Sequence, residues 1–269
     1  LWEHLNDTAD SLATEAHEFQ DPWNSQPKPP LLPAAVFQIT VLDQTLTGRL
    51  TRQLQRSLEE ETARSYIKRK YDWLESELQE IDWAATADAT KKQSYQAQLA
   101  IAKYQHGWLP TNQYQHIRDK SQTPKCLLCG RLENDNHKWT CSQATMREAR
   151  RTKLTKYYDA VNKHTPKILQ QALKTGIQHW LKTELNIKKV NELPLPARVV
   201  VRRQSRIGWD HFFRGRISTS WVRWFVRLGG GDLTAGREWG KLIVRETIKF
   251  GLELWWQRNQ LVHGTTPSE

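Results

Sequence analysis

All three cysteines of the chain lie within one stretch of sixteen residues, and a histidine lies between the second and the third. The spacing is C-x2-C-x7-H-x3-C, formed by Cys126, Cys129, His137 and Cys141. In proteins Zn²⁺ prefers a tetrahedral set of thiolates and imidazoles. Gly130 follows the second cysteine and suits a tight turn, because glycine tolerates positive φ. The stretch therefore predicts a zinc-bound turn that fixes the chain around it.

Two other states of these cysteines have to be weighed against zinc binding. Three buried or free thiols could simply be neighbours, but three cysteines in 269 residues would be expected to scatter. A disulfide fits less well, because the number of cysteines is odd and nothing marks the chain as secreted. His137 and Cys141 are four residues apart, so both point the same way if a helix begins there.

The charge of the chain is strongly positive and unevenly distributed. The formal net charge is +11, although residues 1–43 hold seven acidic residues and one basic residue, Lys28. A body this basic favours polyanions, and nucleic acid, RNA or DNA, is the commonest of them. The alternative is a basic protein whose charge serves only solubility.

No membrane partner is expected, because no uncharged apolar run approaches the ~18 residues that a spanning helix needs. There is no signal peptide, so we expect an intracellular protein, nuclear or cytoplasmic and not secreted. The sequence does not begin with methionine, and we expect a fragment or a processed piece.

Helical periodicity dominates the chain and predicts a mainly α fold, a multi-helix domain with the zinc-bound turn between two helical halves. The apolar rows indicate helices near 47–82, 88–106, 143–164, 166–185 and 232–263. Five prolines between 21 and 35 predict a linker, and residues 36–42 one short strand or an extended docking segment. The expected regions are 1–20, a tail helix; 21–48, the linker and extended segment; 49–120, helical; 121–145, the zinc motif; and 146–269, a basic helical region rich in Trp and Arg.

Two arginine-rich stretches are candidate nucleic-acid contacts. The first is the helix that follows the last zinc ligand. The second is 198–227, where eight arginines face a single acid, Asp210, and aromatic residues lie between them. Arginine binds phosphate in bidentate geometry and stacks on bases. The alternative is that the aromatics are core and the arginines form its solvated rim, and we expect the aromatics to be mostly core. The candidates are Arg147, Arg150, Arg151, Lys153, Arg202, Arg203, Arg206, Arg214 and Arg216.

The first twenty residues resemble the last helix of ribonuclease H domains. The matching residues are Asn6, Ala9, Asp10, Leu12, Ala13 and Ala16. This resemblance implies that Asp10 is an orphan RNase H-like carboxylate, with its partners upstream and absent here. One carboxylate cannot hold two Mg²⁺ ions for in-line displacement, so no catalytic residue is assigned. The alternative is an ordinary amphipathic helix with a solvated Asp10.

Three further segments resemble the zinc-binding region downstream of reverse transcriptase and ribonuclease H domains in retrotransposon polyproteins. They are the run 103–111, the cysteine–histidine stretch 126–141, and the ending at 255–264, which has the pattern W-x-x-R-N-x-x-x-H-G. The retroviral nucleocapsid knuckle has a shorter gap before its histidine, so its RNA contacts do not transfer. The resemblance implies a non-LTR-like element, with the polymerase and RNase H domains of the same polyprotein as partners.

These observations predict a nucleic-acid-binding, zinc-containing segment that is not catalytic on its own. A structural domain that docks on the polymerase is the first alternative, and it predicts internally paired arginines. A target-site nuclease is the second. That nuclease needs a Pro-Asp followed by a D/E-x-K arrangement for Mg²⁺, and neither pattern occurs here.

Overall fold

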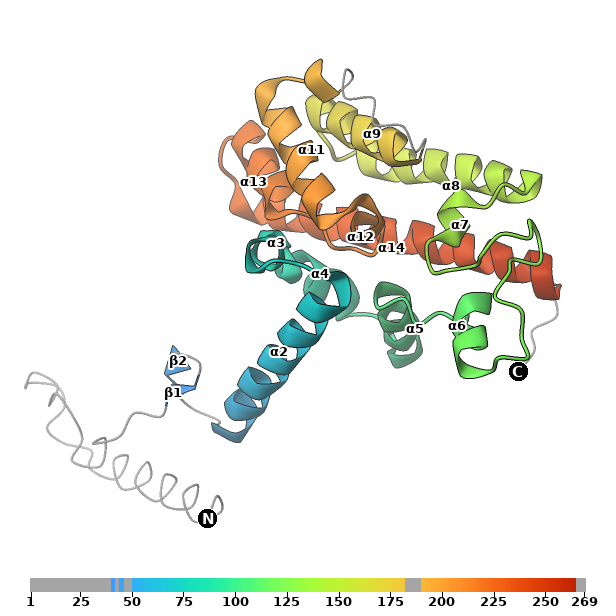
Figure 1. Cartoon of the computed structure of the whole chain (residues 1–269). Coiled ribbons are helices and arrows are strands. Elements are labelled where there is room, and N and C mark those ends of the chain that lie inside the picture. Colours follow the sequence, from blue (N-terminus) through green and yellow to red (C-terminus); the bar gives the residue numbers. More distant parts are fainter. Residues whose placement is uncertain (1–39, 42–43, 46–49, 182–189, 265–269) are drawn as a thin grey trace, which may run out of the picture. The chain divides into compact units, whose positions relative to one another are not determined.

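A computed structural model describes residues 40–41, 44–45, 50–181 and 190–264 (Figure 1). The predicted tail helix with Asp10, and most of the predicted linker, lie outside the described residues. The chain divides into two compact units, Leu1–Trp73 and Leu74–Glu269. The described part is mainly helical, which confirms the prediction of a mainly α fold.

The first unit contains a minimal hairpin and one long helix. β1 (Thr40–Val41) pairs antiparallel with β2 (Gln44–Thr45), with Thr40 opposite Thr45. α2 follows and spans Leu50–Tyr71. Within the segment 36–42, for which the sequence predicted one short strand or an extended segment, the described residues Thr40–Val41 form a strand, and β2 lies just beyond it.

The helical period that runs from 47 to 82 in the sequence is interrupted in the structure. Asp72 has a φ of 52°, a left-handed conformation that cannot continue an α-helix. Two shorter helices follow, α3 (Glu75–Glu80) and α4 (Trp83–Thr90). Asp82 caps α4 by accepting a hydrogen bond from the Ala85 N–H, at 2.9 Å. Apolar periodicity alone does not reveal such a break, because both sides keep the same spacing.

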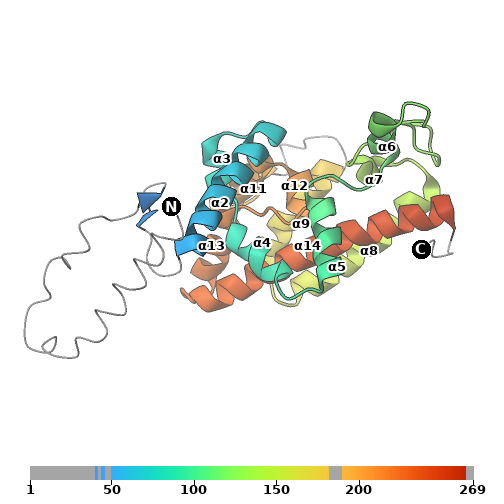
Figure 2. The ribbon, with the colours of Figure 1, turned by 90° about the horizontal axis from the view of Figure 1, so that it is seen from below.

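The second unit is organised around α14 (Leu233–His263), a helix of 31 residues. It packs against α8 along much of its length, and against α4 and α13, as two views at right angles show (Figure 2). The remaining helices are α5 (Tyr95–Gln105), α6 (Asn112–Arg118), α7 (His137–Thr140), α8 (Ala144–Asn162), α9 (Lys167–Leu181), α11 (Leu195–Ile207), α12 (Trp209–Phe213) and α13 (Thr219–Leu228).

Aromatic side chains fill the core of this unit. Phe213 is fully buried, and its ring lies 4.8 Å from Trp139 and 5.3 Å from Phe250, centroid to centroid. Such pairs are stabilising beyond the apolar area they bury. The prediction that the aromatics of 198–227 are mostly core is confirmed. The buried ones are Trp209, Phe212, Phe213, Trp221 and Trp224.

Different parts of the chain meet α14 at its two ends. Near its start Gly236 lies against Val226 of α13, so closely that a Cβ there would meet Val226 Cγ2 at 2.2 Å. Near its end Arg258 pairs with Glu133, in the loop between α6 and α7. The rise of ~1.5 Å per residue places these two contacts roughly 30 Å apart along the helix. The cysteine-containing loop therefore lies at one end of α14, and α13 lies at the other.

Candidate metal centre

The first two cysteines lie on a tight turn closed by backbone hydrogen bonds. The Cys126 N–H donates to the Arg131 carbonyl at 2.7 Å, and the Gly130 N–H donates to the Cys126 carbonyl at 2.8 Å. Gly130 has a φ of 74°, which a side chain would strain. The predicted role of this glycine is confirmed. The turn brings Cys126 and Cys129 to the same side of the loop.

The other two members of the cluster are placed by one turn of helix. α7 begins at His137, and the Cys141 N–H donates to the His137 carbonyl at 2.8 Å. This agrees with the expectation that a helix beginning at His137 would point both side chains the same way. Cys141 immediately follows α7 and precedes α8, so the cluster also fixes where α8 starts.

The four side chains converge. Their ligand atoms all lie within 4.8 Å of one another, and Cys129 Sγ is 3.2 Å from His137 Nε2. Cys126, His137 and Cys141 are buried, and Cys129 is half-buried. Cys126, Cys129, His137 and Cys141 could therefore bind a metal ion.

The environment shifts the pKa values of the four side chains in different directions. Burial raises the pKa of the Cys126 thiol, and it raises that of Cys141 to about 11. Burial also acts to raise the pKa of Cys129, but hydrogen bonds from the Arg131 backbone and side chain outweigh it and lower the value to about 7. Burial lowers the pKa of His137, which favours the neutral imidazole that binds metals. A metal ion would have to displace thiol protons from Cys126 and Cys141.

A buried ion pair ties the loop to α14. Arg258 Nη2 lies 2.5 Å from Glu133 Oε2, and the two side chains are only 4% and 3% exposed. Glu133 Oε2 also accepts a hydrogen bond from the Asn112 N–H, at 3.0 Å. A buried charge is tolerated when it is paired and hydrogen-bonded, and this pair meets both conditions. Removal of either partner would leave an uncompensated charge in the interior.

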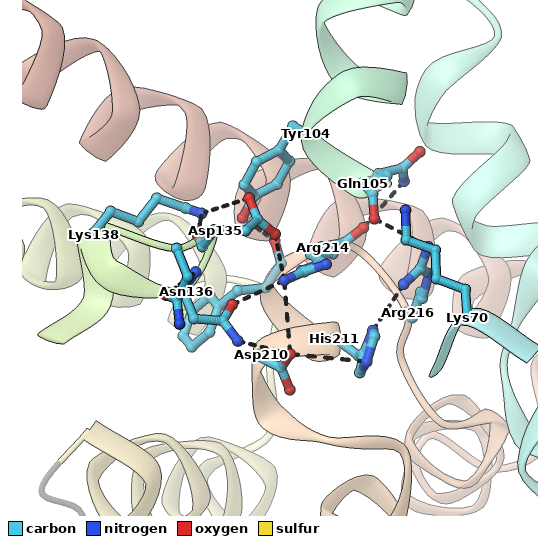
Figure 3. A network of polar contacts seen from close by, with 12 residues as sticks. Lys70, Tyr104, Gln105, Asp135, Asn136, Lys138, Asp210, His211, Arg214 and Arg216 are labelled. Carbon is cyan, nitrogen blue, oxygen red and sulfur yellow. Dashed lines mark hydrogen bonds and ion pairs between the residues drawn. The ribbon is translucent and has the colours of Figure 1, made fainter. Parts of the chain in front are cut away.

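A second set of polar contacts joins the loop to the segment after α12 (Figure 3). Arg214 Nη2 lies 2.5 Å from Asp135 Oδ2 and donates to Asn136 Oδ1 at 2.9 Å. Lys138 is buried, and its ammonium lies 5.1 Å from the centre of the Tyr104 ring. Burial lowers the pKa of Lys138 to about 8. Tyr104 in turn donates to the Phe213 carbonyl at 2.7 Å.

The predicted nucleic-acid contacts on α8 lie in different surroundings. Arg150 donates to the carbonyls of Lys138 and Cys141, at 3.2 and 2.8 Å, so it braces the cysteine–histidine stretch 126–141, called the metal loop below. Arg151 pairs with Glu148 on the surface, and Lys153 lies 3.4 Å from Glu253 of α14. Arg147 is exposed and has no partner among the described residues.

The predicted contacts between 202 and 216 fall into two groups. Arg202 and Arg206 are exposed on α11, and Arg203 is partly exposed and lies 3.5 Å from Glu80. Arg214 and Arg216 are buried. Arg216 Nη1 lies 2.8 Å from His211 Nδ1, and its Nη2 donates to the Gln105 carbonyl. Burial and internal contacts place Arg214 and Arg216 among the interior polar groups and not on the surface.

Three important residues of this site were not singled out from the sequence: Glu133, Asp135 and Arg258. The two acids look like members of a polar spacer between ligands, and Arg258 was noted only as part of a closing pattern without chemistry. The one available signal was the position of Glu133 and Asp135 inside a metal loop, where charged side chains must either face solvent or find a partner. Their arginine partners are 125 and 79 residues away along the chain.

No protein-family model, curated protein or solved structure matches this chain. Among the described residues, no helix has both the length and the apolar character needed to cross a bilayer. The chemistry of the cysteine–histidine cluster and of the charged side chains is therefore the basis for assigning a function.

Proposed function

We propose that this chain is a zinc-stabilised nucleic-acid-binding module. Three thiolates and one imidazole form the donor set that Zn²⁺ accepts in structural sites. The observation that carries the proposal is the convergence of Cys126, Cys129, His137 and Cys141, with ligand atoms within 4.8 Å of one another. Four protein ligands leave no position for water or substrate, so the ion would stabilise the fold and not catalyse a reaction.

The nucleic acid would bind to exposed arginines on α11 and α13. Arg206, Arg223 and Arg227 are exposed and have no partner among the described residues. Arg223 and Arg227 are four residues apart and so share one face of α13. Unpaired guanidinium groups bind phosphate in bidentate geometry, without first breaking an internal ion pair. The retrotransposon-like motifs support an RNA or DNA ligand of a reverse transcriptase polyprotein, with the polymerase and RNase H domains as neighbours.

A second candidate function is a domain that docks on the polymerase. The burial of Arg214 and Arg216 favours this function, because a docking domain is expected to have arginines that are paired or packed internally. The two functions share the metal centre and differ at α13. Only the nucleic-acid-binding reading requires Arg223 and Arg227 to contact phosphate.

The test uses the full chain. Zinc per chain is measured first, and labelled single-stranded RNA and duplex DNA are then titrated at several salt concentrations. We expect one zinc per chain, no stoichiometric zinc in Cys126→Ser, and an affinity that falls steeply with salt. In Arg223→Gln/Arg227→Gln the salt slope should decrease by about 2, because two phosphate contacts are lost.

The matched control is Arg245→Gln/Lys249→Gln. It also removes two exposed charges four residues apart, but from α14, where Arg245 is paired with Glu246. The salt slope should stay close to wild type. A zinc-loaded chain that binds neither nucleic acid at low salt would leave the docking domain as the function. A chain without zinc would overturn the assignment of the metal centre itself.

A further inference from the structure

We propose that metal occupancy at the cysteine–histidine cluster controls the arginine surface of α11 and α13, through a series of neighbouring polar groups across the second unit. The series is called the polar relay below. It consists of Asp135, Asn136, Arg214, Asp210, His211, Arg216 and Gln204. The nucleic-acid ligand in this inference rests on the proposed function, whereas the coupling between the metal centre and α13 does not.

The relay begins inside the metal loop. Asp135 and Asn136 directly precede His137, so the position of that ligand sets theirs. Arg214 Nη2 lies 2.5 Å from Asp135 Oδ2 and 2.9 Å from Asn136 Oδ1, and its side chain is 7% exposed. The position of Arg214 therefore depends on two side chains of the metal loop (Figure 3). If the loop moved, the buried guanidinium would lose both contacts.

The middle of the relay runs through α12. Asn136 Nδ2 donates to Asp210 Oδ2 at 3.3 Å, and the same oxygen lies 3.8 Å from His211 Nε2. His211 Nδ1 lies 2.8 Å from Arg216 Nη1. A guanidinium can only donate, so Nδ1 must be the acceptor, and the proton of the neutral ring sits on Nε2, facing Asp210. The relay thus fixes one tautomer of a buried histidine.

The relay ends where α11 and α13 meet. The Gln204 Nε2 group donates to the Arg216 carbonyl at 3.2 Å. Gln204 Oε1 accepts from the Ser218 N–H at 2.9 Å and from the Trp221 Nε1–H at 3.3 Å. Gln204 is fully buried on α11, and Ser218 is the N-cap of α13. One side chain therefore holds the start of α13 against the helix that carries Arg202 and Arg206.

Buried polar groups of this kind do not adjust gradually. Each must have its partner or be left unsatisfied in a medium of low dielectric, so the arrangement as a whole changes between discrete states. A metal ion that holds Asp135 and Asn136 in place favours the state in which Gln204 holds Ser218, the N-cap residue of α13. Coupling between two sites of a protein is commonly about 5- to 150-fold in affinity, and we expect a value in this range.

The first test measures amide hydrogen exchange in the full chain, with zinc and with a chelator. We expect zinc to slow exchange in the metal loop and also in α13, at least about 5-fold at Val222–Arg227. In Gln204→Met, which keeps the length of the side chain but removes its amide, zinc should still protect the loop but no longer α13. Protection of α13 by zinc to the same extent in this variant would overturn the relay, because it would mean that zinc acts through general folding.

A milder pair of variants tests the other end of the relay. Asn136→Ala removes the contacts with Arg214 and Asp210. Asn134→Ala makes the same chemical change two residues earlier, at an exposed position. It removes the hydrogen bond that Asn134 Oδ1 accepts from the Asn136 N–H, at 3.1 Å, but none of the side-chain contacts that Asn136 makes with Arg214 and Asp210. Zinc protection of α13 should be lost in Asn136→Ala and kept in Asn134→Ala. Equal behaviour of the two variants would contradict the relay, even if Gln204→Met failed to fold.

The last arm uses labelled single-stranded RNA of mixed sequence. By linkage, the factor by which zinc raises RNA affinity must equal the factor by which RNA raises zinc affinity, measured against a chromophoric chelator. Both factors should fall to about 1 in Gln204→Met. A zinc-loaded chain that binds neither RNA nor duplex DNA defeats the proposed function, and the exchange data then decide the relay alone. RNA binding that is unaffected by zinc, together with unchanged exchange in α13, defeats the relay and leaves the function standing.

Discussion

Two groups of arginines in the second unit have the same chemistry but differ in burial and in partners. The interior arginines, Arg214, Arg216 and Arg258, are buried, and their guanidinium groups are held by polar groups of other segments. The surface arginines, Arg206, Arg223 and Arg227, are exposed, with no partner among the described residues. Arg206 and Arg214 are only eight positions apart in the sequence. Local composition therefore cannot decide the role of an arginine here.

Carboxylates of the loop that carries the cysteine–histidine cluster explain much of the difference. Between 198 and 227 the chain offers a single acid, Asp210, so local charge balance suggests that all eight arginines face solvent. The structure supplies carboxylates from elsewhere: Asp135 reaches Arg214, and Glu133 reaches Arg258. Both acids lie in the loop that the cysteine–histidine cluster closes. Arg214 and Arg258 are thus buried where carboxylates of this loop neutralise them, whereas Arg216 is held by His211 and the Gln105 carbonyl. The surface arginines have no such partner among the described residues.

Removal of the metal should have the largest effect. Without the ion, the loop that carries Glu133 and Asp135 is no longer fixed, and both buried ion pairs are lost together. We expect the free energy of unfolding to decrease by roughly 5 kcal/mol or more, in Cys126→Ser or with a strong chelator. The measurement is urea unfolding of the zinc-loaded and zinc-free chains. Equal stability of the two forms would show that the loop holds its acids in place without metal.

Loss of one interior arginine should come next. Arg258→Met leaves Glu133 charged and buried, and the expected cost is about 3–5 kcal/mol with zinc present. The double variant Arg258→Met/Glu133→Leu should recover a large part of this loss, because an apolar pair carries no desolvation penalty. A loss below about 1 kcal/mol in the single variant would mean that water or another side chain compensates Glu133.

Much of the metal centre could be predicted from the sequence because its determinants are local. Cys126 and Cys129 share one turn, and His137 and Cys141 are one helical turn apart. The mainly helical fold followed from apolar periodicity in the same way. Neither prediction required knowledge of a residue more than about sixteen positions away.

What could not be predicted was non-local. Arg150 follows Cys141 on a basic helix, and nothing in that pattern indicates that its guanidinium would bind the Cys141 carbonyl. The pairing of Arg258 with Glu133 joins positions 125 residues apart. A salt bridge depends on where tertiary structure brings two charges, and a single sequence holds no periodic signal for that. The left-handed Asp72, which ends α2, is equally invisible to periodicity.

Acid should lower the stability of the folded chain through His211, which contacts the interior arginine Arg216. Burial and the neighbouring Arg216 and Arg214 lower the pKa of this histidine from its ordinary value of 6.5 to about 3, although Asp210 opposes the shift. Between these two values the unfolded chain binds the proton and the folded chain does not, so stability is lost as the pH falls below 6.5. From pH 6.5 to pH 5 the expected loss is about 2 kcal/mol. Urea unfolding of wild type and His211→Gln checks this.

The difference between wild type and His211→Gln removes the contributions of other titrating groups to the pH dependence, including those of the cysteine–histidine cluster. His211→Gln keeps a hydrogen-bonding side chain but cannot titrate, so its stability should change less over this pH range. The same pH dependence in both proteins would mean that His211 already binds its proton in the folded state. His211 Nδ1 would then carry a proton and could not accept a hydrogen bond from Arg216.

The smallest effect on stability is expected for the surface group. Arg223→Gln/Arg227→Gln should change the free energy of unfolding by less than about 0.5 kcal/mol, because both side chains are exposed and unpaired in the described part of the chain. Glutamine and arginine also have similar helix propensities, so α13 should keep its stability. Urea unfolding at fixed zinc, beside Arg258→Met, gives the contrast directly. A loss above about 1.5 kcal/mol would place these arginines with the interior group, engaged by another part of the protein and not kept free for a ligand.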